Sequence, residues 1–257
     1  MKRRAALTTL GCRLNQSETH LLSDRLEAAG YTVVRWGEPA DLAVINTCTV
    51  TRLAEAKARQ VIRKFIRENP KAFVAVVGCY SQMGAREIAA IPGVDLIIGN
   101  QEKLRLLEYL GDGTKLPQPV IVREKIDPAD FSLQWAGETP FAQRANLKIQ
   151  DGCDFACSFC IIPKARGRAR ARDFADLLRE ARSQVARGVR ELVLTGVNLG
   201  TYEDREGRTL LDVVDALEAI EGLDRLRVSS IEPTTVEHGL LERMASPEHA
   251  LLPFLHL

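Results

Sequence analysis

Short apolar runs alternate with longer amphipathic stretches through the first half of the chain, and this alternation constrains the fold most. Residues 42–45 (LAVI) and 73–77 (FVAVV) are apolar at every position rather than at every second one. Strands of this kind are buried on both faces, as in a parallel sheet with helices on either side. The sequence therefore predicts an open α/β domain with strands at residues 5–9, 42–45, 73–77 and 96–98, and helices at residues 15–29, 52–67 and 103–110. At the start of the first helix, Asn15 and Glu18 resemble a capping box.

The alternation restarts in the second half after a break rich in glycine and proline. Residues 113–143 predict a linker with one edge strand at residues 120–122. Further strands are expected at residues 147–150, 191–194, 226–229 and 251–257, and helices at residues 173–186, 210–220 and 236–244. Repeats of this kind begin a TIM-like (β/α) barrel, whose functional loops follow the carboxyl ends of the strands. The predicted organisation is an N-terminal domain at residues 1–112, the linker, and a barrel domain at residues 144–257 that is incomplete at its C-terminal side.

Three cysteines lie within eight residues of one predicted barrel loop. Cys153, Cys157 and Cys160, the loop trio, are spaced four and then three residues apart, so one loop can turn three thiolates toward a single point. An iron–sulfur cluster requires this, and three ligands leave one iron of a four-iron cubane open to a substrate or cofactor. A zinc site is the alternative. Zinc, however, usually takes four ligands from two separated pairs, and the nearest histidine downstream is His238.

The remaining three cysteines each follow a predicted strand of the N-terminal domain. Cys12, Cys48 and Cys79, the N-terminal trio, come just after the strands at residues 5–9, 42–45 and 73–77. The carboxyl ends of strands in an open parallel sheet share one edge, where ligands bind, so we expect these cysteines to meet at one site. The alternative is three buried cysteines that act as small hydrophobic side chains, a common role for free thiols.

Composition excludes several classes of protein. No apolar run reaches the roughly 18 residues of a membrane span, and the basic N-terminus lacks the apolar stretch of a signal peptide. Six cysteines without an export signal are typical of a reducing compartment, so we expect a cytoplasmic protein with no membrane partner. The net charge of +1 does not argue for or against a nucleic-acid partner.

One basic run follows the loop trio directly. Residues 164–172 contain five cations and no acid, namely Lys164, Arg166, Arg168, Arg170 and Arg172. Such a run can neutralise RNA phosphates beside the site. The alternative is a solvated loop.

Motifs around all six cysteines resemble those of the methylthiotransferases within the radical S-adenosylmethionine (SAM) superfamily. In the first half these are residues 9–16 (TLGCRLNQ), 46–51 (NTCTVT) and 77–82 (VGCYSQ). In the second half they are the C-x3-C-x2-C loop with Phe159 before its last cysteine, residues 149–153 (IQDGC) and 161–163 (IIP), and the strand ends 194–200 (LTGVNLG) and 229–233 (SSIEP). The resemblance covers nearly the whole chain. The sequence at residues 15–16 and 196–200 is most similar to that of the branch that acts on N6-threonylcarbamoyladenosine in tRNA. Lys164 departs from the pattern, because relatives often carry an aromatic residue there.

The resemblance implies two 4Fe–4S clusters, one on each trio, with SAM at the open iron of the loop cluster. Cleavage of SAM would give a radical that takes hydrogen from C2 of the target adenine, while the other cluster would present the sulfur or methylthio group. Phe159, Gly196, Asn198 and Glu232 are the expected SAM contacts. For the last three, ordinary turn residues are the alternative.

The implied reaction is methylthio transfer to C2 of N6-threonylcarbamoyladenosine next to the tRNA anticodon. Arg166, Arg168 and Arg170 are the expected contacts to the anticodon loop, and a reductant such as flavodoxin or ferredoxin is the expected electron donor. The sulfur donor is not indicated. Alternatives are the sister branches that modify isopentenyladenosine in tRNA or an aspartate of a ribosomal protein and, from another class, a non-catalytic metal-binding fragment. Because family members continue into further barrel strands and an RNA-binding domain, we expect the 257-residue form to bind tRNA weakly and to turn over little product alone.

Overall fold

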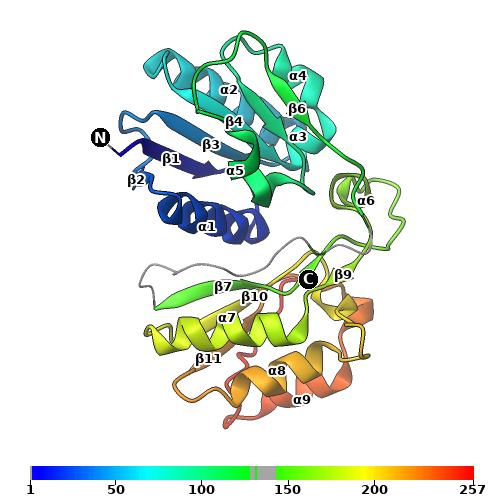
Figure 1. Ribbon diagram of the computed structural model, residues 1–257. Helices are drawn as coiled ribbons and strands as arrows, with labels where there is room; N and C mark the ends of the chain where they lie inside the picture. Colours follow the sequence, from blue (N-terminus) through cyan, green and yellow to red (C-terminus); the bar gives the residue numbers. More distant parts are fainter. Residues whose placement is uncertain (1, 128–130, 132–142) are drawn as a thin grey trace. The chain divides into compact units, whose positions relative to one another are not determined.

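The computed structural model describes residues 2–127, 131 and 143–257, which form two compact units (Figure 1). The first unit comprises residues 2–127 together with residues 157–166, and the second comprises the described residues between 131 and 156 together with residues 167–257. Both units alternate strands and helices, which confirms the predicted α/β class. The domain boundaries stay a prediction, and residues 128–130 and 132–142 of the predicted linker lie outside the described residues.

A six-stranded parallel sheet forms the middle of the first unit, in the order β2-β1-β3-β4-β5-β6. Its strands are β1 (Arg4–Thr9), β2 (Thr32–Val34), β3 (Leu42–Thr47), β4 (Phe73–Gly78), β5 (Leu96–Ile98) and β6 (Val120–Val122). β3 and β4 are buried at every residue, as the apolar runs at residues 42–45 and 73–77 predicted. All five of the strands predicted in this unit are confirmed, while the three-residue β2 was not predicted.

Helices cover both faces of this sheet: α1 (Arg13–Ala28) lies on one face and α2 (Arg52–Glu68) on the other (Figure 1). The side chain of Thr51 caps α2 by accepting from the backbone N–H of Ala54 at 3.1 Å. Helix α2 then packs Ile62 and Phe65 into the core. The shorter helices are α3 (Cys79–Met83), α4 (Ala85–Ala89), the 3-10 turn η1 (Lys103–Arg105), α5 (Leu106–Tyr109) and α6 (Ile162–Arg166).

The start of α1 differs from the prediction. Cys12 occupies the N-cap position, and no side chain caps the helix. The side-chain amide of Asn15 instead donates to the backbone carbonyl of Thr47 at 3.1 Å, and Glu18 pairs with Lys103. The predicted capping box is therefore wrong, because partners from distant segments take both side chains.

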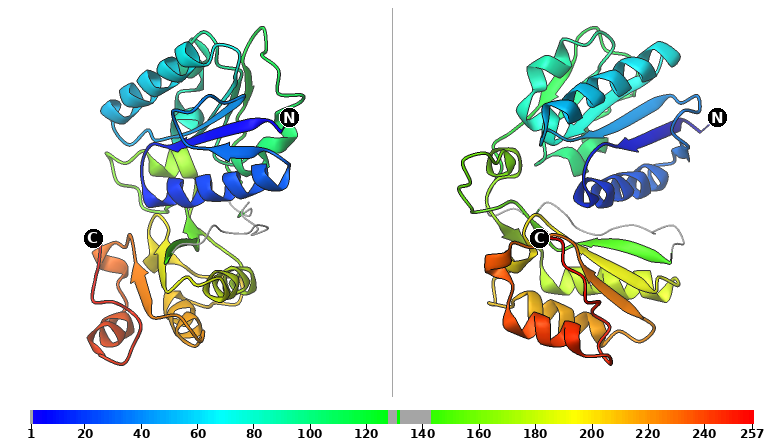
Figure 2. Two further views of the ribbon diagram at one scale, coloured as in Figure 1. Left: turned by 90° about the vertical axis from the view of Figure 1, so that its left-hand side faces the viewer. Right: turned by 180° about the vertical axis from the view of Figure 1, so that it is seen from behind.

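The second unit is built on a three-stranded parallel sheet in the order β11-β10-β7. Its main elements are β7 (Arg144–Lys148), α7 (Phe174–Ala186), β10 (Glu191–Thr195), α8 (Leu210–Glu218), β11 (Arg225–Val228) and α9 (His238–Ala245). The minor ones are β8 (Gln150–Asp151), β9 (Arg170–Ala171) and the 3-10 turns η2 (Leu199–Thr201) and η3 (Pro233–Thr235). The three helices lie on one side of the sheet (Figure 2). Alternate strand residues such as Leu147 and Leu194 join them in the core, which leaves Lys148 and Thr195 on the opposite face.

Local signals set the helices of the second unit. Asp173 caps α7 by accepting from the backbone N–H of Asp176 at 2.8 Å, and Thr209 caps α8 through a capping box. The strand predicted at residues 251–257 is wrong, since this segment makes one parallel bridge, between Leu251 and Leu226, and no strand. Pro253 offers no backbone N–H to extend a ladder. No helix in the described part of the chain combines the length and the apolar sequence that crossing a bilayer requires.

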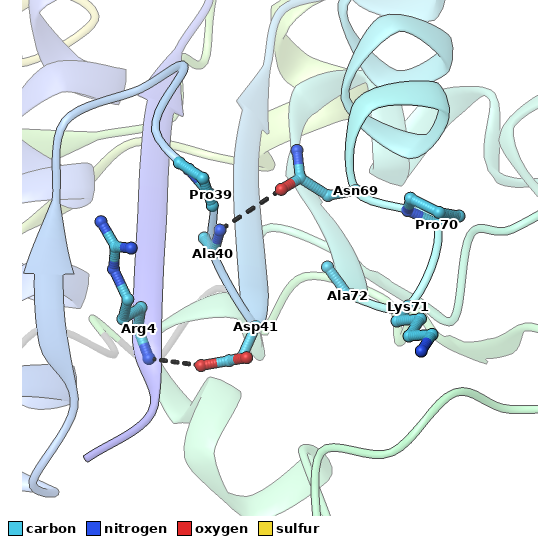
Figure 3. A pocket seen from close by; sticks show the side chains of 8 residues that line it. All are labelled: Arg4, Pro39, Ala40, Asp41, Asn69, Pro70, Lys71 and Ala72. Atoms are coloured by element: carbon cyan, nitrogen blue, oxygen red, sulfur yellow. Dashed lines mark hydrogen bonds between the residues drawn. The ribbon is translucent and has the colours of Figure 1, made fainter. Parts of the chain in front are cut away.

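A pocket of about 350 Å³ lies at the amino-terminal edge of the first unit's sheet (Figure 3). Two hydrogen bonds shape it: the backbone N–H of Arg4 donates to Asp41 at 2.8 Å, and that of Ala40 donates to Asn69 at 3.3 Å. This edge is opposite to the one where β1, β3 and β4 end. The pocket thus lies at the other end of the strands from the N-terminal trio, which follows their carboxyl ends.

Candidate functional site

The N-terminal trio follows three neighbouring strands of the first unit. Cys48 comes directly after β3 and Cys79 directly after β4, while Cys12 lies between β1 and α1. β3 lies between β1 and β4 in the sheet, so all three cysteines follow the same edge, as predicted. Cys48 and Cys79 are buried, Cys12 is exposed, and all three are free thiols.

The other two thiols of the trio affect the pKa of Cys48. Burial is the largest effect and raises the pKa of Cys48, and the nearby Cys79 and Cys12 raise it further. A backbone hydrogen bond from Val50 and the positive charge of Arg166 act in the opposite direction, but the net effect is a raised pKa. Crowded buried thiols become thiolates only beside strong positive charge, which is what a metal centre supplies. The donor set thus fits an iron–sulfur cluster.

The backbone of Gly11, beside Cys48, leaves space next to this thiol. Gly11 has φ of +130°, a conformation that side chains rarely adopt. A Cβ placed on Gly11 would lie 2.9 Å from the Cβ and 3.4 Å from the Sγ of Cys48. Only glycine therefore leaves the space around this thiol open. Among the described residues, no three His, Cys, Asp or Glu side chains are grouped closely enough to hold a single metal ion, and the spacing of the three sulfurs stays a prediction.

The loop trio is divided between the two units. Cys153 is buried in the second unit, and its backbone N–H donates to the carbonyl of Gly167 at 3.1 Å. Cys157 and Cys160 belong to the first unit, where the N–H of Cys160 donates to the carbonyl of Cys157 at 3.1 Å. Cys157 is exposed, Cys160 is half-buried, and the ring of Phe159 is 90% exposed. Two thiols and one aromatic ring of this loop are thus accessible to a ligand.

Gln150 connects the start of the loop to the turn that follows β10, and the sequence analysis gave it no role. Its Nε2 donates to the carbonyl of Gly152 at 2.8 Å. Its Oε1 accepts from the backbone N–H groups of Val197 at 2.8 Å and Asn198 at 3.1 Å. A Cβ on Gly196 would lie 2.8 Å from Oε1, so this glycine allows the close approach. The side-chain amide of Gln150 is fully buried and holds the start of the cysteine loop against the turn that follows β10.

Asn198 carries a buried donor with no partner among the described residues. Its Oδ1 accepts from the N–H of Glu232 at 3.1 Å and from the hydroxyl of Thr235 at 2.9 Å, which sets the orientation of the amide. Its Nδ2 is buried and makes no hydrogen bond to the described residues. The same is true of the hydroxyl of Thr195 at the end of β10. A buried donor without a partner costs about 1–3 kcal/mol, so such groups at strand ends are typical of ligand sites. The structure thus brings Asn198 and Glu232 together, and the contact of Gly196, Asn198 and Glu232 with SAM stays a prediction.

The basic run divides into buried and exposed cations. Arg166 is buried against Glu18, and the side chain of Arg170 is buried near Asp151, with 3.7 Å between Nη2 and the carboxylate. Arg168 is exposed, as is Lys164. The burial of Arg166 and Arg170 does not favour the predicted contact of these two side chains with RNA. Arg168 keeps the accessibility that such a contact needs.

The sequence matches two known families in succession. Residues 4–99 match the family described as "Uncharacterized protein family UPF0004", and residues 147–247 match the radical SAM superfamily. A threonylcarbamoyladenosine tRNA methylthiotransferase (MtaB) of Bacillus subtilis is 39% identical over 248 residues, which is 92% of this chain. The chain is thus similar to the radical SAM methylthiotransferases over nearly its whole length.

Other members of the methylthiotransferase family match at similar levels. The MtaB of Aquifex aeolicus is 37% identical over 99% of this chain, and a tRNA-2-methylthio-N(6)-dimethylallyladenosine synthase of Cereibacter sphaeroides is 33% identical over 99% of it. The chain spans 53% of the length of the Bacillus protein, 62% of the Aquifex protein and 59% of the Cereibacter protein.

Solved structures share the fold at low sequence identity. The radical SAM methyltransferase TsrM from Kitasatospora setae, with cobalamin and a 4Fe–4S cluster bound, gives a TM-score of 0.51 at 16% identity, over 91% of this chain and 62% of that one. The cobalamin-dependent radical SAM enzyme OxsB, with aqua-cobalamin and SAM bound, gives 0.52 at 13% identity, over 91% of this chain and 40% of that one. These likenesses show that the chain shares its fold with these enzymes.

Proposed function

We propose that this protein transfers a methylthio group to C2 of N6-threonylcarbamoyladenosine beside the anticodon of tRNA. The observation that carries the proposal is the presence of two separate three-cysteine sets in a chain whose relatives are named for this reaction. Three ligands leave one iron of a cubane open. Methylthio transfer needs two such irons, one for SAM and one for sulfur.

Each trio binds one 4Fe–4S cluster. For the N-terminal trio, the fit is supported by the raised pKa of Cys48 beside Cys79 and Cys12 and by the space that Gly11 leaves at Cys48. For the loop trio it is supported by the C-x3-C-x2-C spacing and the accessible thiol of Cys157. When bound, the loop cluster and SAM supply the radical chemistry that activates the C2–H bond, which acid–base groups cannot reach.

Side chains at the strand ends of the second unit bind SAM. The buried Nδ2 of Asn198 donates to a carboxylate or ribose oxygen, which satisfies a donor that otherwise has no partner among the described residues. Gln150 and Gly196 hold the turn in which Asn198 lies, and the exposed carboxylate of Glu232 accepts from an amino or hydroxyl group of SAM. The exposed ring of Phe159 offers an apolar face for the adenine.

The exposed cations of the basic run contact the tRNA. Lys164 and Arg168 neutralise phosphates of the anticodon loop, while Arg166 is buried and pairs with Glu18 instead. A reductant such as flavodoxin or ferredoxin supplies the electron, and the reaction takes place in the cytoplasm, where tRNA and such reductants occur.

The test begins with anaerobic reconstitution of the chain with iron and sulfide. Two cubane clusters correspond to about eight irons per chain. The loaded protein is then incubated with SAM, dithionite and tRNA that carries N6-threonylcarbamoyladenosine without a methylthio group, and the nucleosides are analysed by mass spectrometry. The methylthio derivative of this nucleoside is the expected product, in small yield because the 257-residue form is expected to turn over little alone.

Other outcomes assign other functions. Product only from tRNA with isopentenyladenosine would place the protein in the sister branch. Stoichiometric zinc without cleavage of SAM would identify a non-catalytic metal-binding protein. A matched control is the chain in which all three cysteines of the loop trio are changed to alanine, which should bind about half the iron and cleave no SAM.

A further inference from the structure

A buried network supports the N-terminal trio, and its centre is the carboxylate of Glu18. Glu18 accepts from Lys103 and from Arg166, with 3.1 Å between Nη1 of Arg166 and Oε1 and 3.3 Å between Nη2 and Oε2. Glu18 is fully buried, and Lys103 and Arg166 are each 1% exposed. Two cations from distant segments are therefore fixed on one carboxylate inside the first unit.

Each of these cations also orients an asparagine. Nη2 of Arg166 donates to Oδ1 of Asn15 at 2.6 Å, and Nζ of Lys103 donates to Oδ1 of Asn100 at 2.8 Å. An amide whose oxygen accepts from a cation must present its NH₂ group on the other side. The network therefore sets the direction in which each asparagine donates.

The NH₂ group of Asn15 joins two of the strand ends that lead to cysteines. It donates to the carbonyl of Leu10 at 3.2 Å and to the carbonyl of Thr47 at 3.1 Å. Leu10 precedes Cys12 by two residues, and Thr47 precedes Cys48 directly. Asn15 thus fixes the separation of the two backbone segments from which these thiols project.

The NH₂ group of Asn100 connects the third cysteine to α6. It donates to Sγ of Cys79 at 3.6 Å and to the carbonyl of Ala165 at 2.6 Å. Ala165 and Arg166 form the end of α6, which begins two residues after Cys160. The segment that follows the loop trio is therefore a structural part of the support of the N-terminal trio.

We propose that Glu18, Lys103 and Arg166 are positioning residues for the cluster site of the N-terminal trio, and that Arg166 makes this site depend on the segment that follows the loop trio. The inference rests on the proposed function, because it takes the N-terminal trio to hold a cluster. The network sets the spacing of the sulfurs before the cluster binds, as outer hydrogen-bonding partners do at other metal sites. Its positive charges and the hydrogen bond to Cys79 also favour the reduced cluster.

The experiment uses the full chain with the loop trio changed to alanine, so that only the N-terminal trio can hold iron. The test variants in this parent are Arg166→Gln, Arg166→Lys and Asn100→Leu. Lys164→Gln is the matched control, because it removes an exposed cation from the same helix. Without iron, thermal unfolding shows that each variant is folded, and mass spectrometry measures the rate at which iodoacetamide alkylates Cys48 and Cys79. After reconstitution, the loss of iron to a chelator and the reduction potential of the cluster are measured.

We expect Arg166→Gln to raise the alkylation rates and the loss of iron roughly tenfold and to make the reduction potential more negative. Arg166→Lys keeps the charge and should give intermediate values. Asn100→Leu should lower the potential and expose Cys79 more than Cys48. Lys164→Gln should match the parent. Arg166→Lys and Asn100→Leu decide the question if Arg166→Gln does not fold.

The outcomes separate this inference from the proposed function. The inference alone is overturned if a folded Arg166→Gln variant equals the parent in alkylation rate, iron retention and reduction potential. If that variant does not fold, the same result for both Arg166→Lys and Asn100→Leu overturns it. A parent that binds no iron at its N-terminal trio overturns the proposed second cluster. In that case, faster alkylation in the iron-free Arg166→Gln variant would still show that the network positions the thiols.

Discussion

Arg166 and Glu18 are 148 positions apart in the sequence, yet Nη1 of Arg166 lies 3.1 Å from Oε1 of Glu18 within the first unit. Both side chains are almost completely buried. Two charges in such a place are costly unless each has several well-aligned partners. Arg166 also donates to Asn15, and Glu18 also accepts from Lys103, so both meet this condition. A residue of a basic run is therefore used to build the protein interior.

The two clusters should be separable by mutation. Because the trios consist of different ligands, Cys157→Ala should reduce the iron from about eight to about four per chain and abolish SAM cleavage. Cys48→Ala should also remove about half the iron but leave reductive cleavage of SAM in place. Iron counting and detection of 5′-deoxyadenosine check both variants. Loss of all iron from Cys157→Ala would contradict the two-site arrangement.

Gly11→Ala should disturb the N-terminal cluster site specifically. The new Cβ would lie 2.9 Å from the Cβ of Cys48, in a conformation with φ of +130°. We expect about 1–3 kcal/mol of destabilisation and loss of the iron bound by the N-terminal trio. Gly30→Ala is the control, because Gly30 also has positive φ (+89°) but a Cβ there meets nothing within 4 Å. If both variants keep all their iron, the space beside Cys48 is not needed for the cluster.

Asn198→Leu should weaken the binding of SAM roughly tenfold, since it removes the buried donor that we propose to bind SAM. Equilibrium dialysis of the reconstituted protein measures the dissociation constant. Thr235→Val is the control, because it removes the hydrogen bond to Oδ1 of Asn198 and leaves Nδ2 in place. Equal affinities for SAM in the parent and in Asn198→Leu would assign Asn198 to the structure of the turn alone.

Arg168 should contribute to tRNA binding through a phosphate. Arg168→Gln should reduce the slope of log K against log salt by about 0.7–0.9, the change expected for one lost phosphate contact. Arg182→Gln removes an exposed arginine from outside the basic run and should leave the slope unchanged. Binding of tRNA measured by fluorescence anisotropy across a salt series distinguishes the two. An identical slope for both variants would remove Arg168 from the RNA contact.

Glu191 should make the stability of the second unit depend on pH. Burial alone raises the pKa of Glu191, but hydrogen bonds from Arg227 at 3.1 Å and Arg225 at 3.2 Å outweigh it, so the pKa lies below its ordinary value. A lowered folded-state pKa means that the carboxylate stabilises the fold above the unfolded-state pKa. This contribution is lost as the pH falls through the folded-state pKa.

Glu191→Gln should therefore lower the free energy of unfolding by about 1–2 kcal/mol at neutral pH. The difference from the parent should shrink as the pH falls below the ordinary glutamate range. Calorimetry from neutral to acidic pH measures it, and Glu248→Gln, at an exposed site in the same unit, is the control. A difference that stays constant with pH would mean that the charge of Glu191 is not the cause.

The strands and the positions of the cysteines could be predicted because each has a local signal. β3 and β4 contain the short, unbroken apolar runs at residues 42–45 and 73–77, and Cys48 and Cys79 come directly after these strands. In a parallel sheet such ends share an edge, so the arrangement of the N-terminal trio followed from the order of the elements. The positions of Gly196 and Asn198 at a strand end could be predicted for a similar reason, since they follow β10.

The tertiary structure alone decided which charged and polar side chains are buried. In the sequence, Asn15 and Glu18 resemble a helix cap, and Arg166 is one of five cations in the basic run. The burial of these side chains could not be predicted, because local spacing gives no information about distant partners. Burial of an ionised group is stable only where opposite charge and hydrogen-bonding groups converge on it. For Arg166, these are Glu18 and Asn15 on α1, about 150 residues earlier in the chain. Arg168 is instead exposed, so two arginines of the same run differ because of the fold and not because of their neighbours in sequence.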